Sequence, residues 1–327
     1  MASPTCLEIC AGAGGQSYGL ERAGFSHAAA VEIDPDACAT LRLNRPEWEI
    51  VEDDVHNLDG TRYRGITLLA GGVPCPPFSI AGKQLGADDE RDLFPQALRL
   101  VEEAQPEAVM LENVRGLATA RFAAYREAVL NRLSDLGYAT EWQVINASEH
   151  GVPQLRPRFI LVAMRPEIMR NFKWPTPQGT PPTVGEALYP MMAENGWAGA
   201  EAWASRANGI GPTLVGGSRK HGGPDLGPTR AREAWLRLGV DGRGLANEAP
   251  SASIPNEYTP RLTVRMAAAL QGFDPTWTFS GRKTASYRQV GNAFPPPVAE
   301  AVGRSILSAV HAYQNEGLTR LPLRAVS

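Results

Sequence analysis

Cysteine is scarce in this sequence, and the few that occur form no recognisable pairing pattern. The 327 residues include four cysteines, Cys6, Cys10, Cys38 and Cys75. Their spacings contain no Cys-x-x-Cys pair and match no zinc-binding motif, so a disulfide framework and a structural zinc site are excluded and we expect no metal site. In a reducing compartment all four would be free thiols, which leaves one of them available as a nucleophile.

Long apolar runs and an excess of one charge are also missing. No apolar run approaches the length needed to span a bilayer, and the first nine residues lack the basic segment of a signal peptide. Lys and Arg number 32 against 35 Asp and Glu, a net charge of −3. The whole chain therefore carries no sign of nucleic-acid binding, and any such signal must be local. We expect a cytoplasmic protein with no membrane partner.

The first half of the chain alternates strands with helices. Strands are expected at residues 5–10, 27–33, 48–51, 66–70, 108–111, 140–146 and 158–164. Helices are expected before Gly24 and over residues 93–104 and 122–136, where apolar residues recur at helical spacing. This alternation predicts an α/β fold with a doubly wound, mostly parallel sheet. Ligands bind such sheets beyond the carboxyl ends of the strands, where the unusual residues of this sequence lie.

Residues 171–260 differ in texture from the rest of the chain. Proline and glycine become frequent, no clear alternation of helix and strand persists, and several tryptophans argue against disorder. This segment is predicted to be a smaller domain inserted between residues 1–170 and 261–327. In the last part, residues 262–270 and 298–313 are expected to be helical and residues 290–297 irregular.

A glycine-rich turn follows the first strand in Cys10-Ala11-Gly12-Ala13-Gly14-Gly15. Glycines there let the backbone approach a ligand, but a tight strand-to-helix turn needs glycine in any case. Two acidic residues add to the signal: Glu32 ends the second strand and could accept ribose hydroxyls, and Asp54 follows the third and could accept from an adenine amino group. Together they predict an adenosine-containing ligand, without separating NAD from S-adenosylmethionine.

Cys75 separates these two ligands. It lies in Gly71-Gly72-Val73-Pro74-Cys75-Pro76-Pro77, just after the fourth strand. A lone cysteine is usually a small buried hydrophobic residue. Prolines on both sides give this one a rigid, turn-like frame that no core position needs. Hydride transfer has no use for this thiol. A methyl transfer that needs a nucleophile held beside the cofactor does have a use for it.

Two further segments carry polar residues at strand ends. Glu112 finishes an apolar strand in Glu112-Asn113-Val114, which is costly unless it lies at the mouth of a site. Gln154, Arg156 and Arg158 alternate in an extended segment, so all three share one face. The alternative interpretation of this second segment is an exposed polar strand face.

These motifs, in this order, resemble the cytosine-5 DNA methyltransferase family, of the bacterial restriction-modification type. The resemblance also covers Arg261-Leu262-Thr263-Val264-Arg265 with Leu270-Gln271-Gly272-Phe273, Gly291-Asn292-Ala293, and a loop from Phe78 to Arg91. It implies a Rossmann-like methyltransferase fold that uses S-adenosyl-L-methionine and releases S-adenosyl-L-homocysteine. Cys10 departs from the family, which usually has phenylalanine there to pack on the adenine, so its contact should be smaller.

The resemblance implies a role for each site residue. Cys75 would attack carbon 6 of a flipped-out cytosine. Glu112 would protonate or hydrogen-bond the ring, and Arg156 and Arg158 would orient it. The residues expected to bind the cofactor are Cys10, Ala11, Gly12, Gly14, Gly15, Glu32, Ile33, Asp54, Val55, Pro74, Leu93, Asn292 and Ala293.

Residues 171–260 would then be the target-recognition domain for double-stranded DNA. A local excess of positive charge lies between Arg206 and Arg232, although a solvated loop would look the same. The residues expected to contact DNA are Ser79, Lys83, Gln84, Arg219, Lys220 and Arg230. We also expect a monomer near the nucleoid, with a cognate restriction endonuclease acting on the same site.

Three other functions remain to be weighed. A tRNA cytosine-5 methyltransferase shares the catalytic motifs, but that branch typically has Pro-Pro-Cys-Gln where this chain has Pro74-Cys75-Pro76-Pro77. A DNA-binding module without catalysis would have no need of Cys75, Glu112 and both arginines. An NAD oxidoreductase would leave Cys75 and Glu112 unexplained.

Overall fold

The computed structural model describes residues 3–74, 92–217 and 225–319. Its centre is a seven-stranded sheet in the order β3-β2-β1-β4-β5-β8-β6. Six strands run in the same direction, and β8, which lies between β5 and β6, is antiparallel to both. The strands are β1 (Thr5–Ile9), β2 (Ser26–Glu32), β3 (Ile50–Glu52), β4 (Leu68–Gly72), β5 (Ala108–Val114), β6 (Ala139–Asn146) and β8 (Pro157–Met164).

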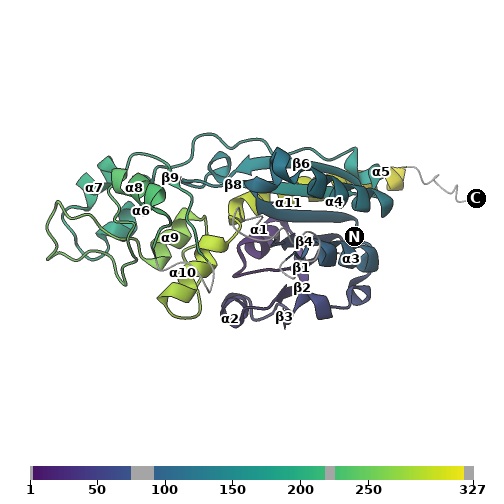
Figure 1. Ribbon diagram of the computed structural model, residues 1–327, viewed down its shortest axis with the longest axis horizontal. Helices are drawn as coiled ribbons and strands as arrows, with labels where there is room; N and C mark the ends of the chain where they lie inside the picture. The colour runs from purple at the N-terminus through teal and green to yellow at the C-terminus, as the bar shows by residue number, and fades with distance from the viewer. Residues whose placement is uncertain (1–2, 75–91, 218–224, 320–327) are drawn as a thin grey trace, which may run out of the picture.

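Helices cover both faces of this sheet, so the predicted doubly wound architecture is confirmed (Figure 1). One face packs against α1 (Gly15–Ala23), α5 (Pro166–Met169) and α11 (Pro296–Thr319). The other packs against α3 (Phe94–Ala104) and α4 (Ala123–Asp135). Alternate residues of β1 divide between the faces: Cys6 joins the first core, whereas Leu7 and Ile9 join the second. The helix α2 (Pro35–Asn44) follows β2.

A smaller lobe lies at one end of the molecule (Figure 1). It holds α6 (Val184–Ala193), α7 (Ala200–Arg206), α8 (Thr229–Arg237), α9 (Val264–Leu270) and α10 (Lys283–Asn292). Its apolar core runs from Val184 to Ala293, with Trp203 and Trp235 fully buried. The short strands β7 (Gln154–Leu155) and β9 (Gly211–Pro212) pair in parallel. No helix among the described residues is long and apolar enough to cross a membrane.

Two local expectations differ from this structure. Residues 290–297 were expected to be irregular, yet α10 continues to Asn292 and α11 begins at Pro296, because proline is well accommodated in the first helical turn. The described part of the segment 171–260 contains three helices despite its proline and glycine. A capping box begins the first of them, α6. The side chains of Thr183 and Glu186 each accept a hydrogen bond from the other's backbone amide.

Candidate active site

Glu112 lies at the carboxyl end of β5, with Gly72 of β4 on one side and Ile160 of β8 on the other. Its Oε1 is 2.7 Å from Nε of Arg158, and both side chains are about one-tenth exposed, at 12% and 11%. Burial raises the pKa of Glu112, while the charges of Arg158 and Arg156 oppose the rise. The site therefore holds a carboxyl group that keeps its proton more readily than an exposed one and still reaches the surface.

Asn113, the next residue, anchors the end of β4. Its Nδ2 donates to the carbonyl of Val73 at 2.7 Å, and the residue is 6% exposed. The amide of Leu93 donates to the carbonyl of Pro74 at 3.2 Å. Two hydrogen bonds thus hold the backbone on either side of residues 75–91. Asn113 belongs to the Glu112-Asn113-Val114 motif, but nothing in its neighbouring residues predicts this hydrogen bond.

Four of the predicted residues lie in that segment. Cys75, Ser79, Lys83 and Gln84 are outside the described residues, so their roles stay predictions. The three cysteines that are described make poor nucleophiles. Cys6 and Cys38 are fully buried. Burial raises the pKa of Cys6, and that of Cys38 to about 12. Burial also raises the pKa of Cys10, with a further contribution from the carboxylates of Glu32, Asp54 and Glu8. A reactive thiolate is therefore disfavoured at each of these three positions.

Arg156 is buried more deeply than its expected role allows. It is 1% exposed. Its Nη1 donates to the carbonyl of Leu214, and its Nη2 donates to those of Gly291 and Ala293, all at 2.8 Å. Because backbone carbonyls enclose the guanidinium, it cannot orient a substrate directly, and we correct that expectation. Arg156 instead joins the sheet lobe to two segments of the smaller lobe.

Gln154 belongs to the same buried network. Its Nε2 donates to Oε1 of Gln271 at 2.7 Å, and its Oε1 accepts from the amide of Leu214 at 2.8 Å. Gln271 in turn donates to the carbonyl of Val290. Gln154, Arg156 and Arg158 do share one side of the chain, but Gln154 and Arg156 are buried. The alternative interpretation of an exposed polar strand face is therefore wrong.

The glycine-rich turn between β1 and α1 is shaped for close approach. Gly12 and Gly14 have φ of 55° and 88°, which side-chain-bearing residues rarely adopt, and a Cβ on Gly12 would meet nothing within 4 Å. Cys10 also has a positive φ, of 52°. The amide of Ala11 donates to the carbonyl of Val31, which joins the turn to β2. The space next to Gly12 is therefore open, while the hydrogen bond from Ala11 to Val31 holds the backbone of the turn against β2.

Glu32 supports this turn as well as facing it. Its Oε2 accepts from the amide of Gly12 at 2.7 Å, and its Oε1 accepts from those of Ile33 and Asp34. Burial raises the pKa of Glu32, and these amides lower it. A carboxylate has about four acceptor positions, so roughly one is left for a ribose hydroxyl. The neighbouring Ile33 is 63% exposed, which suits an apolar contact with an adenine ring.

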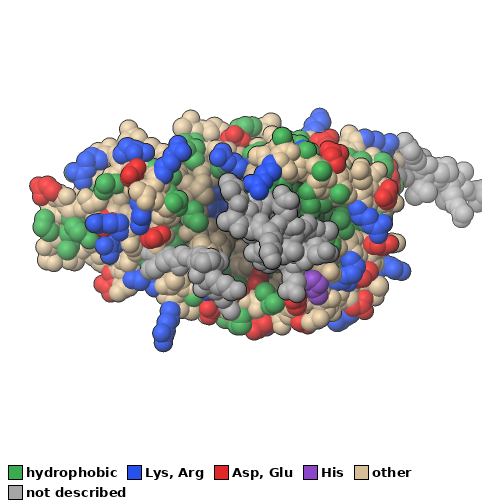
Figure 2. Space-filling model, viewed as in Figure 1, with side chains coloured by type: hydrophobic (Ala, Val, Ile, Leu, Met, Phe, Trp, Pro, Cys, Tyr) green, Lys and Arg blue, Asp and Glu red, His purple; other side chains and the backbone are tan. Residues whose placement is uncertain are grey.

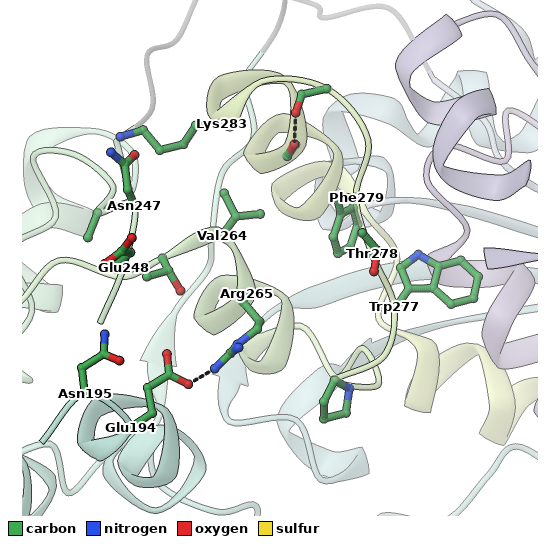
Figure 3. A pocket seen from close by; sticks show the side chains of 15 residues that line it. Glu194, Asn195, Asn247, Glu248, Val264, Arg265, Trp277, Thr278, Phe279 and Lys283 are labelled. Carbon is green, nitrogen blue, oxygen red and sulfur yellow. Dashed lines mark hydrogen bonds and ion pairs between the residues drawn. The ribbon is translucent and has the colours of Figure 1, made fainter. Parts of the chain in front are cut away.

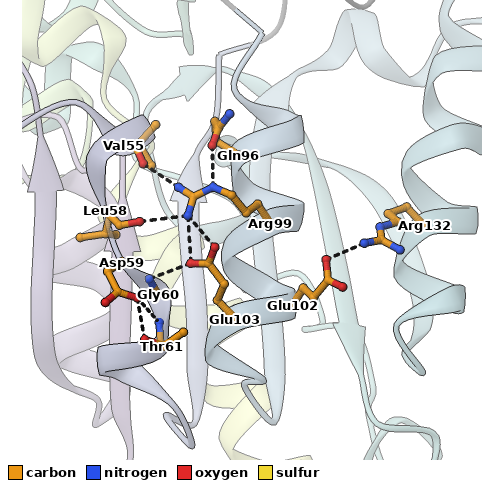
Figure 4. A network of polar contacts seen from close by, with 10 residues as sticks. All are labelled: Val55, Leu58, Asp59, Gly60, Thr61, Gln96, Arg99, Glu102, Glu103 and Arg132. Atoms are coloured by element: carbon orange, nitrogen blue, oxygen red, sulfur yellow. Dashed lines mark hydrogen bonds and ion pairs between the residues drawn. The ribbon is translucent and has the colours of Figure 1, made fainter.

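Asp54 lies half-exposed after β3 and begins the 3-10 turn Val55–Asn57. Its Oδ1 accepts from the amide and from Nδ1 of His56, and these hydrogen bonds lower its pKa. Within the described residues Oδ2 has no hydrogen-bond partner. Figure 4 shows how the following chain is held: Arg99 donates to the carbonyls of Val55 and Leu58 at 3.0 Å and pairs with Glu103. Arg99 thus fixes the buried Val55 beside the candidate adenine site.

The returning segment after α10 meets the start of α1. A Cβ on Gly15 would lie 3.0 Å from that of Ala293 and 2.3 Å from the carbonyl oxygen of Phe294. This contact places Ala293 beside the turn, as expected. Asn292 is exposed, and its Nδ2 donates to the carbonyl of Gly217 at 3.1 Å. Its side chain therefore already has a partner in the smaller lobe.

The residues expected to read DNA are only partly described. Arg219 and Lys220 are outside the described residues. Arg230 is exposed in the first turn of α8, and Arg232 lies 3.8 Å from Asp225. On the face shown in Figure 2, Lys and Arg side chains are spread over both lobes, with acidic residues among them. Contact between these basic side chains and DNA stays a prediction.

Comparison with known proteins identifies relatives over almost the whole chain. Residues 5–308 match the family described as C-5 cytosine-specific DNA methylases. The chain is 56% identical to the type II methyltransferase M.NaeI of Lentzea aerocolonigenes, over 98% of this chain and 78% of that protein. It is 53% identical to M.NgoMIV of Neisseria gonorrhoeae, over 94% of this chain and 98% of that protein.

Solved structures agree at the level of the fold. A prophage-encoded E. coli protein described as a DNA modification methyltransferase superposes with a TM-score of 0.65 at 26% identity, over 96% of this chain and all of that one. DNMT2 of Spodoptera frugiperda superposes with a TM-score of 0.66 at 16% identity, over 93% of this chain and all of that one. The second likeness concerns the fold alone.

Proposed function

Because the chain belongs to the C-5 cytosine-specific DNA methylase family, we propose that it methylates carbon 5 of one cytosine within a specific duplex DNA sequence. The enzyme class follows from the family. The methyl donor, the covalent mechanism and the site specificity are the proposal. The observation that carries the mechanism is the buried pair of Glu112 and Arg158, next to the strand that leads into Cys75.

Cys75 is the nucleophile in this proposal. Carbon 5 of cytosine is a poor nucleophile by itself. When the thiolate bonds to carbon 6, the electrons of the carbon 5–carbon 6 double bond become available at carbon 5, which then takes the methyl group. Loss of the proton from carbon 5 restores the double bond and expels the thiolate. The three described cysteines have raised pKa values, which supports assigning this chemistry to Cys75.

Glu112 and Arg158 act on the cytosine ring. Attack at carbon 6 places negative charge on the ring, and a proton or hydrogen bond at nitrogen 3 offsets it. The raised pKa of Glu112 suits a group that provides such a proton, and Arg158 fixes the direction of its carboxyl group. A base stacked in a duplex cannot reach a carboxyl group in this recess, so the proposal requires base flipping.

S-adenosylmethionine is the proposed donor, and it supplies an electrophilic methyl group when bound. The residues present fit it: the space above Gly12 admits a ligand, and Glu32 keeps one acceptor position for the ribose. Oδ2 of Asp54 would accept a hydrogen bond from the adenine amino group, and Ile33 would pack on the adenine ring. The other proposed contacts of the cofactor are with Val55, Pro74, Leu93 and Ala293. Cys10 takes the place of the usual phenylalanine.

Residues 171–260 are the proposed reader of the DNA sequence. They supply about half of the buried residues in the apolar core that contains Trp203 and Trp235, and Arg230 is exposed on the smaller lobe. Gln154, Arg156 and Gln271 join this lobe to the sheet lobe, so the reader is held at a defined position relative to Glu112. The proposed setting is a cytoplasmic, nucleoid-associated monomer that protects a restriction site from a cognate endonuclease.

Bisulfite sequencing of DNA from a methylation-free host that expresses the chain tests this function. We expect methylation of one cytosine in a short recurring sequence, and none when Cys75 is changed to serine. Hosts that express M.NaeI and M.NgoMIV serve as references, since identity to both exceeds one half over nearly the whole chain. Methylated tRNA with unmodified duplex DNA would instead establish the RNA methyltransferase.

A further inference from the structure

Trp277 connects the smaller lobe to the glycine-rich turn of the sheet lobe. It lies in the loop between α9 and α10, outside every motif that the sequence suggested. The residue is 6% exposed, and its indole Nε1 donates to the carbonyl of Ala13 at 3.1 Å. The bond joins residues 264 positions apart in the chain.

The indole ring also packs against the first turn of α1. A Cβ on Gly14 would lie 2.6 Å from Cζ2 of Trp277, so the ring occupies the space next to this glycine. The centroid of the Tyr18 ring is 5.1 Å away. The ring therefore restricts rotation of the peptide between Ala13 and Gly14, both through its hydrogen bond to Ala13 and through its contact with Gly14.

Arg45 also contacts the ring. Its guanidinium lies 5.1 Å from the centroid of Trp277, 5.5 Å from that of Tyr18 and 5.7 Å from that of Trp48. Both oxygens of Glu21 accept from the same guanidinium, at 2.7 and 2.6 Å. Trp277 thus contacts both a cation, itself held by Glu21, and the glycine-rich turn.

The loop around Trp277 also lines a cavity of about 600 Å³ in the smaller lobe. Trp277, Thr278 and Phe279 all line this cavity, and the Trp277 ring extends from its edge toward the purple N-terminal part of the chain (Figure 3). The hydrogen bond to Ala13 agrees with this direction. The indole N–H is therefore directed to the turn, although the residue also borders the cavity.

We propose that Trp277 is a positioning residue that sets the glycine-rich turn in the conformation that binds the cofactor. This inference rests on the proposed S-adenosylmethionine site. Without the indole N–H, the buried carbonyl of Ala13 loses its partner, and the peptide before Gly14 can rotate away from the binding conformation. The smaller lobe would then contribute to cofactor affinity as well as to DNA reading.

The test is isothermal titration of S-adenosylhomocysteine into wild type, Trp277→Phe and Trp203→Phe. Trp277→Phe keeps an aromatic ring and removes the N–H, so Kd should rise about 3- to 10-fold, the range for one net hydrogen bond. Trp203→Phe is the matched control. It removes a buried indole bond to the carbonyl of Gly239, at 2.8 Å, that does not involve the turn, so Kd should stay within twofold.

The outcomes separate the two proposals. If wild type binds no S-adenosylhomocysteine, the proposed cofactor is wrong. If wild type binds and Trp277→Phe binds equally well, or if both variants weaken alike, the role of Trp277 is wrong. A cofactor KM that rises with an unchanged Kd for DNA supports it. Should Trp277→Phe fail to fold, Arg45→Met removes the cation that contacts the ring. We expect a two- to fivefold weaker Kd, and an unchanged value would overturn the inference.

Discussion

Arg158 and Glu112 form a diagonal pair across two antiparallel strands. Arg158 lies opposite Val114 in the register of β8 and β5, and Glu112 is two residues before Val114 on β5. Diagonal neighbours on one face of a sheet are within reach of long side chains, and here Nε and Oε1 are 2.7 Å apart. The sheet register thus aims a buried carboxyl group at the edge where the fourth strand leads into Cys75.

We expect Glu112→Gln to slow methyl transfer by about two to four orders of magnitude, the range for a lost acid–base group. The affinity for S-adenosylhomocysteine should stay within about twofold, because the described contacts of Glu112 are made with Arg158 and not with the turn at Gly12. Single-turnover kinetics and calorimetry measure the two quantities. Lost cofactor binding with turnover preserved would show that the assigned role is wrong.

Cys75 should form an irreversible adduct with DNA that carries 5-fluorocytosine at the target, because fluorine at carbon 5 cannot leave as a proton does. Denaturing electrophoresis detects the adduct, and Cys75→Ser should abolish it. Cys38→Ser is the matched control and should leave it intact, since Cys38 is buried and its pKa is raised to about 12. An adduct that survives Cys75→Ser, or that maps to another cysteine, contradicts the assignment.

The two arginines of the Gln-x-Arg-x-Arg motif should respond differently to substitution. Arg156→Met removes a donor from three buried carbonyls, of which that of Ala293 keeps only a longer bond from Gln271 at 3.3 Å, so the free energy of unfolding should fall by about 2–4 kcal/mol. Arg158→Lys keeps a charge near Glu112 but changes the geometry, so it should lower kcat with a smaller loss of stability. Denaturant unfolding and kinetics distinguish them. Equal stability losses would argue against separate roles.

Sequence choice should move with residues 171–260. A chimera that carries this segment from a relative with a different methylated site should methylate the relative's site, as bisulfite sequencing would show. Within the segment, Arg230→Ala should relax one target position by about 1–3 kcal/mol if it contacts a base. For Arg219 the expectation is the same. Lys220→Ala should weaken binding to all sequences alike and reduce its salt dependence. A folded, active chimera that keeps the original target places the reader elsewhere.

Asp241 should make stability depend on pH. Hydrogen bonds from Arg243, then from Arg261, hold the pKa of Asp241 well below its ordinary value. A group whose pKa is lower in the folded state stabilises above its unfolded pKa, and that contribution is lost as pH falls toward the folded value. Asp241→Asn should therefore cost about 1 kcal/mol at pH 7, and the difference should shrink below about pH 4. An equal difference at pH 7 and pH 3 would contradict this.

Several candidate site residues could be predicted from the sequence because the residues next to each of them carry the signal. Glu32, Asp54 and Glu112 each follow an apolar run, and the carboxyl ends of parallel strands meet at one edge of a sheet. The small lobe was harder to foresee, since its helices are short and glycine and proline surround them. Its one strong local signal was the pair of Thr183 and Glu186 at the start of α6.

The sequence by itself determined the parallel sheet, the order of the motifs and the family, because strand periodicity and turn chemistry are properties of adjacent residues. Tertiary structure alone decided what Arg156 and Trp277 touch. The partners of Arg156 lie 58, 135 and 137 residues away, and that of Trp277 lies 264 residues away. These partners are backbone carbonyls, which every residue has. Only the folded chain determines which of them become buried beside a donor.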